Sequence, residues 1–315
     1  MRQSAESEII NGDGSEVAVE RDKERGTVVQ PSCRSASGVL ASIPMIYRLR
    51  IPRAPLSYFV ENLWFYRDLE TDHAREKLLP DAAMELIIDL GEGEKKLYDA
   101  RDHSLCRGYE RCWISGMQKQ FLVIGTEPGA SMMGAHFRTG GAAPFFGFPL
   151  SELASQVVEL DLIWQREILA LREQLLEAEE IEAKFDLLEA FLLVKAQSRL
   201  DPDKTVAAAL HALRSWPVIP LKELASRLGL SHKQMLARFD CRVGLTPKQT
   251  SRIFRFRQSL QAAHGAEAPD WSDLAADYGY YDQAHMIHEF QEFAGMTPAE
   301  YWRRRTIYPH YVSVD

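Results

Sequence analysis

Two stretches of the sequence place a hydrogen-bonding side chain just after a residue that can cap a helix. Lys233 follows Ser231, and Gln283 follows Asp282. In the DNA major groove a lysine ammonium donates to O6 or N7 of guanine, and a glutamine amide pairs with adenine. Both stretches therefore carry side-chain chemistry suited to base recognition, provided that the surrounding elements hold these side chains on an exposed helix face.

The two stretches belong to an internal repeat. Residues 221–229 align with residues 271–279 and share a Leu-Ala pair and a final glycine, and each stretch reads as a short helix with one apolar stripe. Gly229 and Gly279 can adopt the left-handed conformation that ends a helix. A second helix would then begin at each cap residue. Two helices joined by a tight turn containing glycine form the helix-turn-helix pattern.

The second helix of each unit has a matching buried side. Met235 and Phe239 lie four residues apart, as do Met286 and Phe290, so each pair shares one helix face and is expected to pack on the preceding helix.

A third helix begins with the same signal in both units. Thr246 and Thr297 are each followed by proline and then by Gln249 or Glu300, which predicts a capping box with proline at the first helical position. The first of these helices, from Pro247 to about residue 264, would connect the units.

These residues resemble the AraC/XylS family of bacterial transcription regulators over about residues 205–305. The family implies that one chain places two recognition helices in successive major grooves, ~34 Å apart, and recruits or blocks RNA polymerase. Residues 79–87 and 141–153 more loosely resemble an N-terminal domain of some of these regulators. The matching C-terminal motifs are Leu224-Ala225, Leu228 to Ser231, Arg238-Phe239, Gly244 to Pro247, Gly279 to His285, Phe290 and Gly295 to Tyr301.

The side of each second helix opposite its buried pair is expected to face DNA, although any one of these residues could be an ordinary solvent-facing side chain. The expected base-reading residues are His232, Lys233, Leu236 and Ala237 in the first unit and Gln283, Ala284, Ile287 and His288 in the second. The expected contacts to the DNA backbone are Ser231, Gln234, Arg238, Lys248, Arg252, Arg255 and Arg257.

The two units differ in their charge. Residues 221–260, the first unit, hold nine Lys or Arg and two acids, whereas residues 261–300, the second unit, hold eight acids and no Lys or Arg. Phosphate contacts supply much of DNA affinity. We therefore predict that the first unit dominates binding and that the second binds weakly or faces polymerase. Residues 303–305, three consecutive arginines, could restore some backbone contact.

The predicted fold class is α+β. Residues 1–40 read as a disordered extension, with Met45 an alternative start, and residues 41–148 as a β-rich sandwich or barrel for an effector or for dimerisation. Residues 149–215 follow helical periodicity and predict a connector or a dimerisation surface. The DNA-binding domain would span residues 216–305, followed by a tail at 306–315. The expected strands lie within residues 56–66, 84–90, 112–114, 121–124 and 131–137.

Aromatic residues of the β-rich domain could line an effector pocket or simply form its core. The residues concerned are Trp64, Tyr66, Trp113, Phe137, Phe145 and Phe146. His136 has no neighbouring histidines in the sequence, so we expect no metal and no cofactor. Cys106 and Cys112 are weak candidates for a redox switch.

Composition narrows the alternatives. The formal net charge is −8, and the four cysteines lack the spacing of a zinc site. No apolar run is long enough for a membrane span, and the N-terminus lacks an apolar signal segment, so we expect a soluble, cytoplasmic protein.

The expected partners are double-stranded DNA, RNA polymerase, a small-molecule effector and a second copy of the chain. Alternatives are an interaction adaptor with a degenerate second unit, or an enzyme domain fused to a DNA-binding tail, for which no nucleophile or phosphate motif is present.

Overall fold

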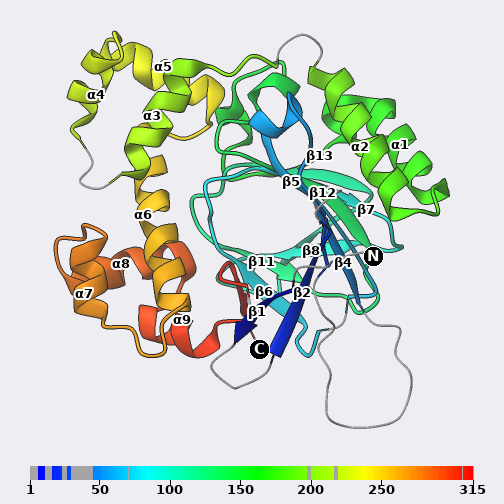
Figure 1. Cartoon of the computed structure of the whole chain (residues 1–315), viewed down its shortest axis with the longest axis horizontal. Helices are drawn as coiled ribbons and strands as arrows, with labels where there is room; N and C mark the ends of the chain where they lie inside the picture. The colour runs from blue at the N-terminus through cyan, green and yellow to red at the C-terminus, as the bar shows by residue number, and fades with distance from the viewer. Residues whose placement is uncertain are drawn as a thin grey trace.

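The structure is a computed structural model that describes residues 45–314, except residues 70, 197–199, 216–218 and 307, together with three earlier strands (Figure 1). Those strands are β1 (Glu6–Ile10), β2 (Glu16–Asp22) and β3 (Thr27–Val29). The other residues before 45 lie outside the described part, and with them most of the extension expected to be disordered.

Two antiparallel sheets form the N-terminal domain, and with the helices that follow they confirm the α+β fold class. Sheet A has the order β1-β2-β3-β4-β5-β12-β7-β10-β13, and sheet B the order β14-β6-β11-β8-β9. The further strands of sheet A are β4 (Ile46–Arg50), β5 (Val60–Arg67), β7 (Glu85–Asp89), β10 (Cys112–Ser115), β12 (Met132–Phe137) and β13 (Val157–Glu159). Sheet B contains β6 (Arg75–Leu78), β8 (Lys95–Tyr98), β9 (Cys106–Tyr109), β11 (Leu122–Gly125) and β14 (Tyr311–Ser313).

The five expected strands are present, but only the structure shows which sheet two of them join. Residues 112–114 and 121–124 flank a turn in the sequence, yet β10 lies in sheet A and β11 in sheet B. Gly116, in the connection between them, approaches the backbone of Leu153 so closely that a Cβ would lie 1.8 Å from its carbonyl oxygen. Glycine is therefore required where the chain crosses from one sheet to the other.

The two faces of sheet A carry different cores. Leu63 and Phe65 of β5 belong with Phe137 to the main buried cluster, which continues beneath the helices. Trp64 and Tyr66, on the opposite face of the same strand, join Trp113 in a smaller cluster that reaches sheet B. Because successive side chains of a strand point to opposite faces, this second cluster lies between the sheets.

Helices α1 (Asp161–Glu177) and α2 (Ile181–Ala196) cover the outer face of sheet A (Figure 1). The helical periodicity expected from residue 149 begins only at Asp161. Before it, the apolar residues form short 3-10 helices, η2 (Ala143–Phe145) and η3 (Leu150–Leu153), and then β13. Another 3-10 helix, η1 (Leu56–Tyr58), precedes β5. Leu150, Leu153 and Leu160 are buried although none of them lies within an α-helix. Apolar residues at these positions therefore did not by themselves identify a helix.

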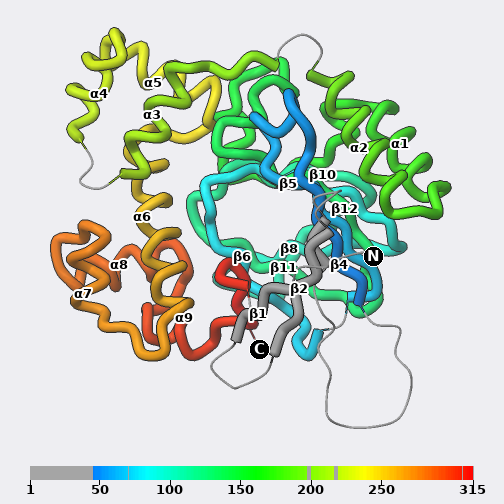
Figure 2. Tube along the Cα trace, in the orientation of Figure 1, coloured from blue at the N-terminus to red at the C-terminus, as the bar shows by residue number. Residues whose placement is uncertain are grey.

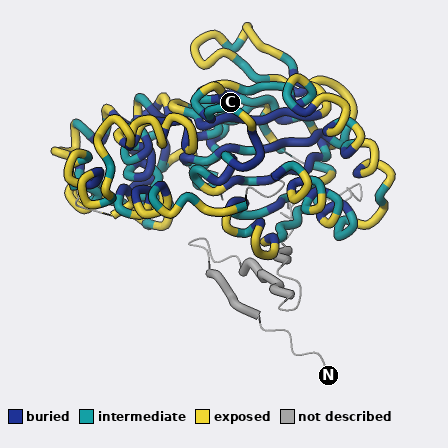
Figure 3. The backbone as a smooth tube through the Cα atoms, turned by 90° about the horizontal axis from the view of Figure 1, so that it is seen from above, coloured by how far each residue is buried: buried dark blue, intermediate teal, exposed yellow. Residues whose placement is uncertain are grey.

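The C-terminal region is helical up to residue 304. Its helices are α3 (Lys204–Arg214), α4 (Leu221–Arg227), α5 (His232–Arg242), α6 (Pro247–His264), α7 (Trp271–Asp277), α8 (Gln283–Ala294) and α9 (Pro298–Arg304). Both predicted capping boxes at Thr246 and Thr297 are confirmed. Gly229 and Gly279 have φ of 70° and end their helices as predicted. Buried residues follow the strands and the inner sides of the helices (Figure 3).

After α9 the chain returns to the N-terminal domain. The sequence predicted only a tail at residues 306–315. β14 pairs antiparallel with β6, so the C-terminal segment lies beside that strand at the edge of sheet B (Figure 2). The pairing extends past the strand, because the Leu79 amide donates to the His310 carbonyl at 2.9 Å. Val312 is fully buried on the side facing the main core.

None of the helices in the described part of the chain is long and apolar enough to cross a membrane.

Candidate nucleic-acid interface

The first recognition helix candidate, α5, starts at a complete capping box. The Ser231 hydroxyl accepts from the Gln234 amide at 3.2 Å, and the Gln234 side chain accepts from the Ser231 amide at 2.8 Å. These two side chains were expected at the DNA backbone. In this structure both are used to satisfy the free amides of the helix end, which fixes where α5 begins.

The face of α5 away from the protein carries the expected base-reading residues. Met235 is 1% exposed and Phe239 is fully buried, so they hold α5 against the domain core. The helix therefore presents a continuous surface to the outside. The residues on it are His232, Lys233, Leu236 and Ala237, all of which are exposed.

The second unit repeats this arrangement on α8. The Asp282 carboxylate accepts from the His285 amide at 2.8 Å, and Met286 and Phe290 are fully buried. Gln283, Ala284 and His288 are exposed, whereas Ile287 is half-buried.

Sequence reasoning missed Tyr281, which is 92% exposed immediately before the α8 cap and lies beside the expected base readers. Its position just before a cap residue, within the matching motif from Gly279 to His285, was the available signal.

The candidates for backbone contact divide into two groups. Lys248 and Arg238 are exposed, and Arg238 also pairs with Asp203 at the start of α3 at 2.8 Å. Arg252, Arg255 and Arg257 are half-buried and are bonded within the protein. Their guanidinium groups are therefore not free to meet phosphate in this arrangement.

Glu289 is the centre of this internal pairing. It is 1% exposed, and its carboxylate lies 2.7 Å from Arg252 Nε and 2.6 Å from Arg255 Nη2. Arg252 also reaches Glu292 at 2.5 Å, which lowers the pKa of that carboxyl group. Both arginines lie on α6 and both acids on α8, so the pairs fasten the connecting helix to the second unit.

These pairs change the charge argument made from the sequence. Arg252 and Arg255 were counted with the first unit, yet they neutralise acids of the second. Asp270, Asp282 and Glu300 in turn accept from the backbone amides at the starts of α7, α8 and α9. The charge contrast between the units is therefore smaller in the structure than in the sequence, because Arg252 and Arg255 pair with Glu289 and Glu292, whereas the capping carboxylates keep their charge.

The β domain contacts both helix-turn-helix units. Close to the end of α5, Gly244 lies against the Leu150 backbone, where a Cβ would lie 2.9 Å from the carbonyl oxygen. At the end of α8, Lys77 Nζ donates to the Ala294 carbonyl at 3.1 Å, and Phe121 packs against Gly295. The relative position of the two recognition helices is therefore fixed in part by the β domain.

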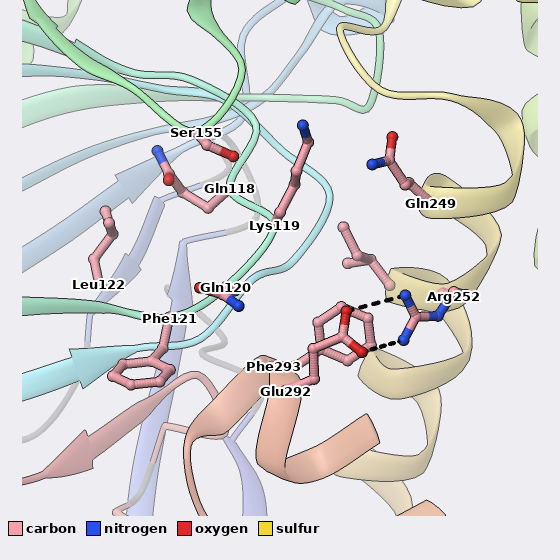
Figure 4. Close-up of a pocket in the computed structure, with 11 residues that line it drawn as sticks. Gln118, Lys119, Gln120, Phe121, Leu122, Ser155, Gln249, Arg252, Glu292 and Phe293 are labelled. Carbon is pink, nitrogen blue, oxygen red and sulfur yellow. Dashed lines mark hydrogen bonds and ion pairs between the residues drawn. The ribbon is translucent and has the colours of Figure 1, made fainter. Parts of the chain in front are cut away.

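A cleft of about 390 Å³ lies where the β domain meets the second unit (Figure 4). Arg252 and Glu292 face each other across one side of it and are bonded together, so their charges are already paired. None of the expected effector residues lines this cleft. The β domain contributes Gln118, Lys119, Gln120, Phe121, Leu122 and Ser155, and the helices contribute Gln249, Arg252, Ile253, Glu292 and Phe293.

The aromatic residues expected to share an effector pocket are separated by sheet A. Trp64 and Tyr66 stack at 5.7 Å between ring centroids and join Trp113 between the sheets. Phe137 is fully buried in the main core on the other face, with Phe145 and Phe146. These three phenylalanines are core residues, because the alternation along β12 turns Phe137 outward from the inter-sheet space.

The surroundings of His136 and Cys112 show how each of these reactive side chains is held. Burial lowers the pKa of His136, but the carboxylates of Asp81 and Glu85 outweigh it and raise that pKa to about 9. No group of three or more potential metal ligands occurs among the described residues. Burial raises the pKa of Cys112 to about 12, which disfavours the thiolate needed for redox exchange with Cys106.

Comparison with known protein families agrees with this geometry. Residues 224–304 match the family described as a helix-turn-helix domain. This region is a helix-turn-helix domain. Residues 49–159 match a family described as a domain of unknown function (DUF6597), which covers most of the two sheets upstream of the helix-turn-helix domain. No curated protein matches the chain significantly.

Several solved structures are distantly similar. Apo ToxT from Vibrio cholerae strain SCE256, with one substitution, is 11% identical, with a TM-score of 0.43 over 78% of this chain and 97% of that chain. ToxT from Vibrio cholerae O395 is 11% identical, with a TM-score of 0.42 over 76% and 97%. The AraC-like transcriptional activator CuxR is 12% identical, with a TM-score of 0.18 over 79% and 82%. Similarity at this level does not extend to ligands.

Proposed function

We propose that the chain is a sequence-specific transcription regulator that reads the major groove through α5 and α8. The observation that carries the proposal is the repeated geometry of these helices. Each begins at a side-chain cap, buries a Met-Phe pair, and exposes the opposite face with base-reading side chains. A side chain on such a face reaches base edges when the helix lies in the groove.

The first unit is proposed to supply most of the affinity. Lys233 on α5 is exposed and carries a positive charge, whereas the exposed side chains at the equivalent end of α8 are uncharged or acidic. Lys248 and Arg238, exposed near the same unit, are the proposed backbone contacts. Arg252, Arg255 and Arg257 are left out of the proposed interface because they are half-buried and bonded within the protein.

Selection of genomic DNA fragments by the purified full chain tests this function. Enrichment of a shared sequence motif, with affinity falling steeply between ~50 and ~200 mM salt, is expected of a regulator that contacts phosphates. A motif confined to one half-site would restrict base reading to the first unit. If no sequence is enriched at any salt concentration, the adaptor function becomes the better proposal.

The other expected partners complete the proposal. A small molecule would bind in the N-terminal domain, RNA polymerase would meet the exposed acidic surface of the second unit, and a second copy of the chain could pair through α1 and α2. With these roles the protein would act in the cytoplasm. Leu162 and Val194, which are 71% and 72% exposed on α1 and α2, support the dimer surface.

A further inference from the structure

The turn of the second helix-turn-helix unit is one residue longer than the turn of the first. Gly229 and Gly279 align at an offset of 50, whereas the cap residues Ser231 and Asp282 align at an offset of 51. The first turn therefore has one residue between its glycine and its cap, and the second turn has two.

The backbone shows which of these two residues is the additional one. In the first unit the Leu230 amide donates to the Ala225 carbonyl at 2.9 Å. In the second unit the Tyr280 amide donates to the Ala275 carbonyl, also at 2.9 Å. Tyr280 therefore takes the place of Leu230, and Tyr281 has no counterpart in the first unit.

The two tyrosines of this turn have opposite surroundings. Tyr280 is 5% exposed, and its hydroxyl lies 3.1 Å from the hydroxyl of Ser259 on α6. Tyr281 is 92% exposed. Burial of an aromatic ring is favourable, so a tyrosine that the fold leaves in solvent gains little stability from its ring. The ring and hydroxyl of Tyr281 are thus available to a partner outside the chain.

The backbone of Tyr281 is nevertheless held in place. Its amide donates to Nδ1 of His285 at 3.1 Å, and the next residue, Asp282, caps α8 through the His285 amide at 2.8 Å. On the other side, Tyr280 is fixed in the core. The side chain therefore projects from a defined point on the turn, and little backbone ordering is needed when a partner binds.

The turn lies at the opposite end of α8 from the contact with the β domain. Lys77 of the β domain donates to the Ala294 carbonyl at the C-terminal end of this helix. The helix has 12 residues, so ~18 Å separates that end from the turn. Gln283 and Ala284, exposed in the first turn of α8, follow directly. Tyr281 therefore lies at the edge of the surface expected to face DNA.

The charge of the second unit limits how it can hold DNA. Residues 261–300 contain no Lys or Arg, the side chains whose permanent positive charge usually meets phosphate. Tyrosine hydroxyls are uncharged donors that also bind phosphate oxygens. A hydrogen bond to an ionised acceptor is stronger than one between neutral groups. An exposed tyrosine beside α8 is therefore well suited to contact the DNA backbone in this unit.

We propose that the Tyr281 hydroxyl donates to a phosphate of the DNA backbone and thereby fixes α8 in its groove. The inference rests on the proposed function, because it assigns a further contact to the same interface. Such a contact sets the register of the helix on the duplex and reads no base. The hydroxyl is neutral and releases no counterion, so this contribution to affinity does not depend on salt.

The variant Tyr281→Phe tests the contact because it removes only a hydroxyl that the fold leaves in solvent. Fluorescence anisotropy of the full chain, with a duplex carrying the selected motif, is expected to show binding about tenfold weaker than that of the wild type. Tyr58→Phe, 61% exposed on the β domain, is the matched control and should bind like the wild type. Wild-type affinity in Tyr281→Phe would overturn the proposal.

The salt dependence of the same measurement identifies the kind of contact. The slope of log affinity against log salt concentration should be unchanged in Tyr281→Phe. Lys248→Ala, which removes a proposed charged contact, should reduce the magnitude of that slope by ~0.9. A slope altered as much in Tyr281→Phe as in Lys248→Ala would contradict a neutral contact.

Replacing single phosphates of the duplex with uncharged methylphosphonates locates the contact. In the wild type, one position beside the second half-site is expected to weaken binding, and Tyr281→Phe should lose little further at that position. The two changes form a double-mutant cycle, so a shared loss identifies the contacting pair. Equal losses in both proteins at every position would overturn the proposal.

Single base-pair changes in the duplex separate a phosphate contact from base reading. The factor lost in Tyr281→Phe should be the same on all of these duplexes. A loss confined to one base pair would make Tyr281 a base-reading residue and overturn the phosphate contact. If the wild type binds the selected motif and Tyr281→Phe binds equally well, only this inference fails. A wild-type chain that selects no DNA contradicts the proposed function as well.

Discussion

At the scale of single residues, the structure sorts the expected contacts by whether they are free to act. Lys233 is exposed at the start of α5, whereas Arg252 and Arg255 are bound to Glu289 inside the molecule. All three are basic residues of the first unit, and all three count equally in its sequence charge. Burial and ion pairs within the protein determine which of these side chains is free to contact DNA.

Replacing Lys233 with alanine should weaken binding to selected DNA more than replacing Gln283. A lysine contact to guanine together with its charge is worth about 1–3 kcal/mol, and α5 is proposed to supply most of the affinity. Fluorescence anisotropy with a labelled fragment measures both, and Lys222→Ala is a control outside the recognition face. Equal losses for Lys233→Ala and Gln283→Ala would contradict the proposed dominance of the first unit.

His136 should make stability fall as pH rises above neutrality. Burial lowers its pKa, but Asp81 and Glu85 raise it from 6.5 to about 9. A group whose pKa is higher in the folded state stabilises fully below its unfolded pKa, and that contribution disappears as pH passes the folded value. The loss between pH 6.5 and 9 should be on the order of 2–3 kcal/mol.

Urea unfolding of the wild type and of His136→Gln at several pH values measures this effect. The variant is expected to be less stable at pH 6 and to show a flatter profile up to pH 9. A variant profile parallel to that of the wild type would mean that His136 is not charged between its two carboxylates.

At the scale of elements, α6 belongs to both units. It begins at the capping box of the first unit and carries the arginines that hold α8 of the second. The sequence predicted a connector between the two units. The ion pairs make it part of the core of the second, so the orientation of α8 follows that of α6.

Glu289→Gln should loosen this attachment. The buried carboxylate would become neutral while two guanidinium groups stay beside it, which should cost about 1–3 kcal/mol in the free energy of unfolding. Chemical denaturation provides the measurement, and Glu267→Gln, exposed after α6, is the matched control. A loss no larger than that of the control would show that the pairs contribute little.

At the scale of the whole molecule, the two domains are joined at both ends of the DNA-binding region. Gly244 near the end of α5 packs on η3, and the last strand, β14, completes sheet B. A change between the sheets can therefore reach the second unit without passing along the chain through α1 and α2.

Val312→Asp should release the C-terminal strand. Val312 is fully buried, and an uncompensated carboxylate there should cost several kcal/mol, enough to favour undocking. Hydrogen exchange should then become faster at the Leu79 amide, which donates to His310 in the docked state. Ser313→Asp, next to it but half-buried, is the control. Unchanged exchange at Leu79 would mean that the strand stays paired.

The sequence alone determined the local features of this protein. The caps at Ser231, Thr246 and Thr297, the helix ends at Gly229 and Gly279, and the buried Met-Phe pairs follow from interactions within a few residues, so spacing was enough to predict them. The five expected strands were recognisable for the same reason, because apolar runs bounded by turn signals are local patterns, whereas β4, β6, β8, β9, β13 and β14 were not predicted.

Only the tertiary structure decided which of these pieces meet. Three features join residues far apart in the chain: the placement of β10 and β11 in different sheets, the pairing of Arg252 with Glu289, and the return of β14 to sheet B. Such contacts depend on the burial and charge of both partners at once. Phe137 and Trp64 show the consequence: from the sequence both could line one pocket or belong to the core, and the two faces of sheet A separate them.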